Sequence, residues 1–222
     1  MNRISFAEQS SDSCTGKRCL GSKFNIGSWF RLPGARKDMQ QDRRKAPPDA
    51  EQALAKLASS LAEQASGDGI QRILIGIHRG GAWAAERLHD ILSDRCPQLF
   101  SQDMGYLSSA FHRDDYGHNA QRRALSALVI GKTELPFEVT GSNIVLIDDV
   151  LYTGRTLRAA LNELFDYGRP AKVELAVLLD RGGRELPIQA DYCGGSIVLG
   201  SREAVLLAQD DRKLLSFSIQ ER

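Results

Sequence analysis

Residues 145–156, VLIDDVLYTGRT, place two adjacent carboxylates where a buried strand is expected to end. Four apolar residues lead into Asp148 and Asp149, and a Thr-Gly turn then leads into a helical pattern. In open α/β sheets the ligand binds at the carboxyl ends of the strands. Two adjacent carboxylates repel each other unless a ligand or a cation compensates them. The N–H groups of the turn and the following helix N-terminus favour an anion.

The ligand that suits this pattern has a phosphate at one end and vicinal hydroxyls at the other, as a ribose 5-phosphate does. We predict that the two carboxylates hold the 2′ and 3′ hydroxyls and that the phosphate lies on the turn. The sequence is not a P-loop, because no Gly-Lys-Ser/Thr follows. The alternative is a capped helix after a strand whose acidic pair has no function. The predicted site residues are Asp148, Asp149, Tyr152, Thr153, Gly154, Arg155 and Thr156.

Hydrophobic periodicity predicts the elements that position this turn. Helices are expected at 50–65, after the N-cap Asp49, at about 81–95 and from about 156 to 167. Buried strands are expected at 72–77, 104–111, 143–147 and 172–180, with weaker candidates at 191–199 and 213–219. Residues 112–142 form a polar stretch too long for an ordinary connection. The alternation of strands and helices predicts an α/β fold with a mostly parallel central sheet flanked by helices.

Charge divides the 222-residue chain into two parts. Residues 1–48 contain 10 Lys and Arg against 4 Asp and Glu, whereas residues 49–222 contain 19 against 24. The first part has no lasting periodicity, which predicts a disordered basic extension or a segment absent from the native protein, with translation starting at Met39. The domain is therefore expected at 49–222.

The remaining composition is that of an ordinary globular chain. No apolar run approaches the roughly 18 residues that cross a bilayer. The cysteines form neither a CxxC pair nor a zinc spacing, so we expect free thiols in a reducing cytoplasm. They are Cys14, Cys19, Cys96 and Cys193.

The turn resembles the phosphoribosyl-diphosphate signature of type I phosphoribosyltransferases. The segments LIGIHRGGAWAAERL, FHRDDY and DRGGRELPIQADYCG narrow the resemblance to the PyrR family, which regulates pyrimidine operons and has uracil phosphoribosyltransferase activity. The resemblance covers about 49–222 and none of 1–46. It implies the type I phosphoribosyltransferase fold with a flexible loop at about 112–136 and a small C-terminal hood at about 180–200.

The same resemblance implies roles for three further groups of residues. GIHRGG matches the diphosphate-binding loop, whose backbone N–H groups would hold the leaving diphosphate. Many members have an arginine in place of Gly80, and here Arg79 would supply that charge. Each group also has an alternative without function. His78 would be an ordinary surface histidine, the flexible loop a solvated loop with surface charge, and the hood a hairpin stabilised by salt bridges. The implied residues are His78, Arg79, Gly80 and Gly81 for diphosphate, Arg113, Asp114 and Asp115 for the flexible loop, and Arg181 and Arg184 for the uracil hood.

The implied reaction converts uracil and phosphoribosyl diphosphate to UMP and diphosphate. Mg²⁺ would arrive on the substrate, so no dedicated metal site is needed, and the acidic pair would stabilise an oxocarbenium-like transition state. The resemblance also implies a homo-oligomer. The alternative is a nucleotide-sensing, RNA-binding attenuator with little catalytic activity. A purine-type enzyme is disfavoured by the hood sequence.

The chain departs from the family at its RNA-facing positions. RNA-binding members present a threonine, an arginine, a histidine and another arginine on the first helix, and three basic residues on the hood. Phosphate contacts by Lys and Arg supply much of the affinity for RNA, so we expect RNA binding to be weak or lost. The corresponding residues here are Ala55, Lys56, Ser59 and Gln64 on the helix, and Arg184, Gln189 and Gly195 on the hood.

Overall fold

The computed structural model describes residues 46–108 and 131–221. Expectations for the basic extension, including Met39 and its two cysteines, lie outside these residues. So do the predicted flexible-loop residues Arg113, Asp114 and Asp115. The last residues of the predicted loop, 131–136, are described and return along the edge of the sheet, where Glu134 bridges to Tyr106.

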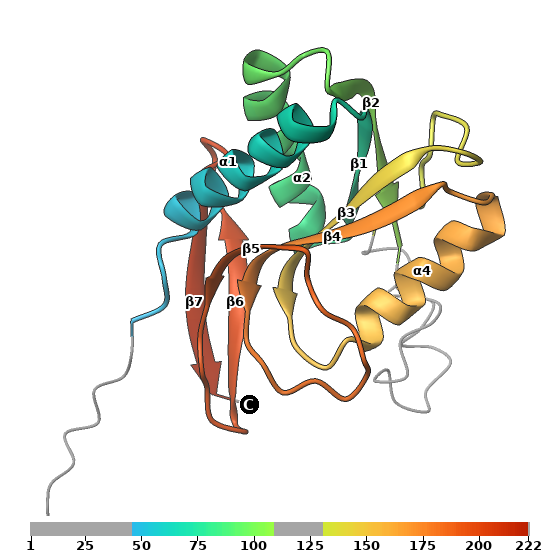
Figure 1. Ribbon diagram of the computed structural model, residues 1–222. Helices are drawn as coiled ribbons and strands as arrows, with labels where there is room; N and C mark the ends of the chain where they lie inside the picture. Colours follow the sequence, from blue (N-terminus) through green and yellow to red (C-terminus); the bar gives the residue numbers. More distant parts are fainter. Residues whose placement is uncertain (1–45, 109–130, 222) are drawn as a thin grey trace, which may run out of the picture. The chain divides into compact units, whose positions relative to one another are not determined.

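A five-stranded parallel sheet forms the centre of the described residues (Figure 1). Its strand order is β2-β1-β3-β4-β5, which puts β3 in the middle. The bounds are β1 (Arg72–Ile77), β2 (Phe100–Leu107), β3 (Asn143–Leu151), β4 (Lys172–Asp180) and β5 (Tyr192–Ser196). The predicted parallel α/β architecture is therefore confirmed.

Helices cover both faces of this sheet (Figure 1). α1 (Ala50–Asp68) and α2 (Gly80–Arg95) pack on one face, and α4 (Arg155–Tyr167) packs on the other. The Asp49 carboxylate caps α1 by accepting hydrogen bonds from the N–H groups of Glu51 and Gln52 at 2.9 and 3.1 Å. The helix ends at Gly69, whose left-handed backbone suits glycine.

Each face of the sheet has its own apolar core. The core under α1 and α2 includes Leu54, Leu57, Leu61, Leu88 and Phe100, together with residues of the C-terminal hairpin. The core under α4 includes Ile75, Ile77, Leu146, Leu157 and Leu164. Burial of β1 and β3 on both faces explains their nearly continuous apolar sequences.

The structure corrects several predicted boundaries. β3 does not stop at Ile147 but continues through the acidic pair to Leu151, because Asp148 and Val150 still pair with β4. β2 begins at Phe100 and ends at Leu107, rather than covering 104–111. The predicted hood of about 180–200 divides into an irregular segment at 181–191 and the edge strand β5.

A strand that has no counterpart among the predicted elements completes the fold. β6 (Glu203–Gln209) pairs antiparallel with β7 (Leu215–Glu221) in a separate hairpin. β7 corresponds to the predicted weak strand at 213–219.

Cys96 and Cys193 are free thiols. Among the described residues, no helix is both long and apolar enough to cross a membrane.

Candidate functional site

The acidic pair lies on β3, at the carboxyl end of the parallel sheet. The Asp148 side chain is buried and that of Asp149 is half-buried. Asp148 Oδ1 accepts a hydrogen bond from the N–H of Asp149 at 3.1 Å, and Asp149 Oδ1 accepts one from the N–H of Val150 at 2.9 Å. Within the described part of the chain the Asp149 carboxylate has no ion pair. Its negative charge is therefore available to a ligand.

The turn after β3 has the backbone that the anion prediction requires. Gly154 has φ +90°, a conformation that favours glycine, and α4 starts at the next residue. The Gly154 carbonyl oxygen accepts the N–H of Arg158 at 3.0 Å, which begins the helical pattern. Thr153 Oγ1 accepts the N–H of Arg155 at 3.3 Å. The helix N-terminus thus adjoins the acidic pair, as the sequence predicts.

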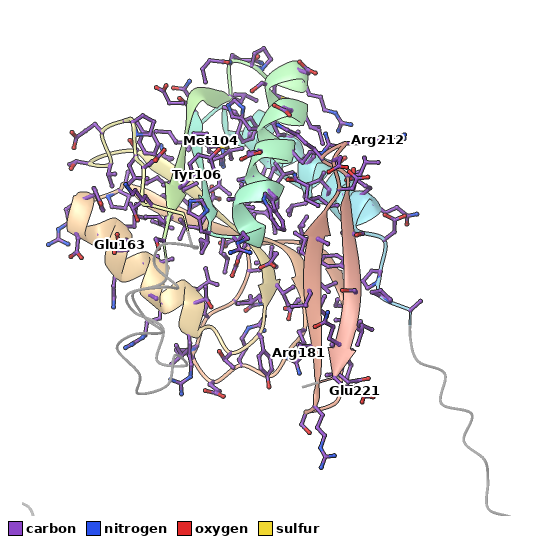
Figure 2. All side chains as sticks on the ribbon, turned by 180° about the vertical axis from the view of Figure 1, so that it is seen from behind. Met104, Tyr106, Glu163, Arg181, Arg212 and Glu221 are labelled. Carbon is purple, nitrogen blue, oxygen red and sulfur yellow. The ribbon has the colours of Figure 1, made fainter. Side chains whose placement is uncertain are left out.

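A cleft of about 460 Å³ opens over this turn. Every predicted residue of the turn lines it, and so does Arg181 of the hood. Figure 2 shows Arg181 near the β6–β7 hairpin, and Ala204 and Val205 of β6 supply an apolar part of the wall. The lining residues are Asp148, Asp149, Val150, Leu151, Tyr152, Thr153, Gly154, Arg155, Thr156, Leu157, Arg181, Glu185, Ala204 and Val205.

The predicted diphosphate loop lies directly against the acidic pair. A Cβ added to Gly80 would collide with the Asp149 carboxylate, and one added to Gly81 would collide with the carbonyl oxygen of Ile147. These two glycines therefore permit a close approach between the ends of β1 and β3. The peptide bond between His78 and Arg79 is cis.

The structure limits what His78 can contribute to diphosphate binding in that loop. Its N–H donates to the carbonyl oxygen of Leu107 at 2.9 Å, so it extends the sheet and is not available to diphosphate. Its ring stacks on Tyr106 with centroids 5.4 Å apart, and burial lowers the pKa of the imidazole. Tyr106 Oη donates to Glu86 Oε1 at 3.3 Å, and burial raises the pKa of this phenol to about 12. A neutral His78 would contribute shape rather than charge.

Hydrogen bonds join the hood segment 181–188 to the turn. The N–H of Arg181 donates to the carbonyl oxygen of Leu151 at 3.0 Å. The N–H groups of Glu185 and Leu186 both donate to the carbonyl oxygen of Thr153, at 3.0 and 3.1 Å. Because the carbonyls of Leu151, at the end of β3, and Thr153, in the turn, both bind the hood, the two segments hold each other in place.

Arg184 reinforces this connection with its whole guanidinium group. Nε donates to the carbonyl oxygen of Ile188 at 3.0 Å. One terminal nitrogen donates to the carbonyl oxygens of Leu151 at 3.2 Å, Tyr152 at 2.9 Å and Gly182 at 3.3 Å. The other donates to the Asp180 carboxylate at 2.7 Å. The structure thus places Arg184 inside the hood as a link to the turn.

Gly154 and Arg155 also contact the hood. A Cβ on Gly154 would lie 3.4 Å from the Cβ atoms of both Leu186 and Ile188. Arg155 Nε pairs with Glu185 Oε2 at 2.8 Å across the edge of the cleft.

The described residues contain no cluster of three or more His, Cys, Asp or Glu suited to a metal ion.

Comparisons with known proteins agree with this geometry. The family model for the Phosphoribosyl transferase domain matches residues 40–205. The "Bifunctional protein PyrR" of Nitrosococcus oceani is 50% identical over 147 residues, which cover 66% of this chain and 77% of that protein. The Pseudomonas aeruginosa protein of the same name is 43% identical over 175 residues, covering 76% and 96%.

A solved structure supports the fold independently. The hypoxanthine phosphoribosyltransferase of Trypanosoma cruzi superposes with a TM-score of 0.53 at 19% identity, covering 78% of this chain and 95% of that one. At this identity the similarity concerns the fold alone.

Proposed function

Because the chain belongs to the PyrR family of phosphoribosyltransferases, we propose that it transfers the phosphoribosyl group of phosphoribosyl diphosphate to uracil, which gives UMP and diphosphate. One observation carries the proposal. The acidic pair, the N-terminus of α4 and the hood line a single cleft, so that groups suited to ribose, phosphate and nucleobase lie side by side.

The residues of the cleft suggest how each part of the substrate is held. Asp148 and Asp149 accept hydrogen bonds from the ribose hydroxyls, and the 5′-phosphate lies at the N–H groups of residues 153–156. The diphosphate leaves along Arg79, Gly80 and Gly81. As the C1–oxygen bond breaks, positive charge develops on the ribose, and the acidic pair stabilises it. A ring nitrogen of uracil, which gives up its proton, then completes the new bond to C1.

Mg²⁺ fits this arrangement as a companion of the substrate. Asp148 and Asp149 are hard oxygen donors of the kind that Mg²⁺ accepts, and the described residues add no cluster of three or more His, Cys, Asp or Glu to them. When bound with phosphoribosyl diphosphate, Mg²⁺ neutralises charge on the leaving group. The protein residues orient the sugar and exclude water. A cytoplasmic location and a homo-oligomer, both predicted from the sequence, remain part of the proposal.

An assay of nucleobase choice tests the reaction. Purified protein is supplied with phosphoribosyl diphosphate and Mg²⁺, together with either uracil or hypoxanthine, and nucleotide and diphosphate are measured. We expect UMP and diphosphate in equal amounts from uracil, and no nucleotide from hypoxanthine. Nucleotide formed from hypoxanthine alone would instead assign a purine-type enzyme, and no product with either base would contradict the proposed reaction.

A second candidate function is regulation through RNA, which the resemblance to the PyrR family implies. The helix positions that face RNA in the family, Ala55, Lys56, Ser59 and Gln64, are all exposed on α1, yet only one of them is basic. On the hood, Arg184 is already bound to Asp180 and to backbone carbonyls. We propose that RNA binding by these surfaces is weak.

A titration with a stem-loop from the leader of a pyrimidine operon tests this second candidate. It is carried out at physiological salt, with and without UMP, because phosphate contacts make RNA affinity depend on salt. We expect weak binding that UMP does not strengthen. Tight binding that UMP strengthens, and that persists in a chain starting at Met39, would establish the regulator.

A further inference from the structure

Two arginines of the hood, Arg181 and Arg184, differ in how their charge is compensated. Arg184 donates to the Asp180 carboxylate at 2.7 Å and to several carbonyls. Arg181 has only 9% of its surface exposed. Its guanidinium stacks 3.8 Å above the Tyr152 ring and donates to the carbonyl oxygen of Gly200 at 3.2 Å.

Within the described residues, no carboxylate pairs with Arg181. The carboxylate next to it in the sequence, that of Asp180, is engaged by Arg184 and by the N–H of Gly182 at 2.7 Å. A buried cation whose partners are only a carbonyl oxygen and an aromatic face destabilises the protein, because no opposite charge offsets the free energy of desolvation. The energetic imbalance points to an anionic partner that comes from the ligand.

The position of Arg181 in the cleft indicates which part of the ligand it meets. The acidic pair faces the ribose hydroxyls, and the N-terminus of α4 faces the phosphate. Arg181, Tyr152, Ala204 and Val205 line another part of the cleft. The Glu185 carboxylate also lines the cleft, but it pairs with Arg155 at 2.8 Å. Around Arg181 the lining combines the Tyr152 ring with the apolar side chains of Ala204 and Val205, which suits a planar nucleobase. In such surroundings a charge interacts more strongly than in water.

We propose that Arg181 binds uracil as its ring anion and so takes the place of a general base. This inference rests on the proposed function. Uracil is an imide, and its ring N–H releases its proton to solvent as the base enters the cleft. The negative charge, shared with the ring oxygens, is held by the guanidinium of Arg181. The ring nitrogen then forms its bond to C1 of the ribose while the C1–oxygen bond breaks, and that electron pair leaves with diphosphate.

With this assignment the cleft has a negative and a positive end, whose charges are opposite to those that develop on the substrates. Asp148 and Asp149 lie where the ribose becomes positive, and Arg181 lies where the base is negative. Electrostatic stabilisation of this kind acts through fixed charges and requires no residue to accept a proton. It also favours pyrimidines with an acidic ring N–H over bases that lack one.

The test compares Arg181→Gln with Arg181→Lys and, as a matched control, Arg184→Gln. For each variant kcat/KM is measured across pH with uracil and with 5-fluorouracil, whose ring N–H is more acidic. We expect Arg181→Gln to lower kcat/KM for uracil about 10- to 100-fold, the usual loss for a charge-assisted hydrogen bond. The loss with 5-fluorouracil is smaller, the pH profile moves upward, and Arg181→Lys restores part of the rate.

The control separates charge from structure. Arg184→Gln removes the same charge from a group that connects the hood to the turn. We expect it to lower stability, to weaken both substrates equally and to leave the pH profile in place. Equal losses on the two substrates in Arg181→Gln, without a shift in the pH profile, would overturn the inference. An Arg181→Gln variant with normal kcat/KM would also overturn it while leaving the proposed reaction intact.

A spectroscopic measurement does not depend on turnover. Ionisation of the remaining ring N–H of bound UMP changes its ultraviolet spectrum and can be titrated. We expect the midpoint for UMP bound to the wild-type protein to lie about one pH unit or more below that of UMP bound to Arg181→Gln, since a nearby cation favours the anion. The same midpoint in both proteins would refute the role of Arg181, whatever the enzyme assay shows. Such a shift in a protein that makes no UMP would support the charge on Arg181 and contradict only the reaction.

Discussion

At the amino end of the sheet Arg72, the first residue of β1, lies 1% exposed between two carboxylates. At the carboxyl end, Asp149 faces the cleft with no ion pair among the described residues. Both charges are held by strands of the same sheet, and both adjoin a buried core. They differ in whether the protein or a ligand is expected to provide the opposite charge.

The amino-end network is complete within the protein. Arg72 binds the Asp68 carboxylate at 2.6 Å and Glu174 at 2.8 Å. Glu174 also accepts hydrogen bonds from Lys172 at 2.8 Å and from Tyr192 Oη at 2.9 Å. The hydrogen bond from Arg72 holds the pKa of Asp68 far below its usual range. Burial, followed by the bond to Glu174, raises the pKa of Tyr192 to about 12.

The comparison separates charges that serve the fold from charges that serve the ligand. Removing one member of a satisfied buried network takes a partner from the remaining members, so stability falls. Removing a charge that the protein leaves unpaired relieves repulsion, so stability is kept while ligand binding falls. The two ends of the sheet should therefore respond to substitution in opposite ways.

The largest expected effect is on stability at the amino end. Arg72→Met leaves Asp68 without its ion pair and takes one of three partners from Glu174, and we expect the free energy of unfolding to fall by about 3 kcal/mol, the low end of the cost of breaking a buried pair. Urea denaturation measures the loss, and turnover per folded molecule should stay normal. Lys172→Met is the matched control: its side chain is 56% exposed, so its ion pair with Glu174 contributes about 1 kcal/mol or less. Equal losses for the two variants would show that burial does not set the strength of the network.

A glycine substitution at the carboxyl end should affect activity more than stability. Gly80→Ala forces a methyl group into the Asp149 carboxylate, so the diphosphate loop must move away from the acidic pair. We expect turnover to fall about 10- to 100-fold, because small displacements of catalytic groups are costly. Gly67→Ala provides the control, since its new Cβ meets nothing within 4 Å. That change should leave turnover unaltered and raise helix stability by about 0.5–1 kcal/mol. Normal turnover in Gly80→Ala would show that the position of the diphosphate loop does not affect the reaction.

A smaller effect is expected from acid. Burial acts to raise the pKa of Glu174, but hydrogen bonds from Lys172, Arg72 and Tyr192 outweigh it, so its folded pKa lies below the ordinary 4.5. A depressed folded pKa means that the unfolded chain binds more protons, so stability falls as the pH drops below about 4.5. Unfolding free energies measured from pH 7 to pH 3 should show this decline, and Glu174→Gln should weaken it. A flat profile over that range would contradict the network.

The sequence predicted the parts of the fold that depend on strong local patterns. The apolar run at 72–77 coincides with β1, and the helix predicted at 50–65 corresponds to α1, which extends three residues further to Asp68. Edges were harder to predict. β2 begins at Phe100, and exposed polar residues follow in its first half. They are tolerated because β2 is an edge strand, so one of its sides faces no neighbouring strand. β6 was missed because its partner β7 lies in a separate hairpin, although Asp210 and Asp211 between two apolar runs give a turn signal.

For the site, the sequence predicted the identity of the residues better than their contacts. All seven residues predicted for the phosphoribosyl turn line one cleft. The contribution of Ala204 and Val205 has no local signal, because it depends on how the hairpin packs. Arg181 and Arg184 look equivalent in the sequence. Only the structure shows that Arg184 binds a carboxylate, whereas Arg181 has no carboxylate partner among residues 46–108 and 131–221.

The most direct test of the contrast is to measure turnover and unfolding free energy together in Asp149→Asn. The amide keeps the size of the side chain and removes its charge. The account predicts a loss of turnover of at least about 10- to 100-fold, since charge-assisted hydrogen bonds to the ribose hydroxyls are lost. It also predicts an unfolding free energy that is unchanged or slightly higher. Near-normal turnover, or a loss of stability as large as that of Arg72→Met, would contradict it.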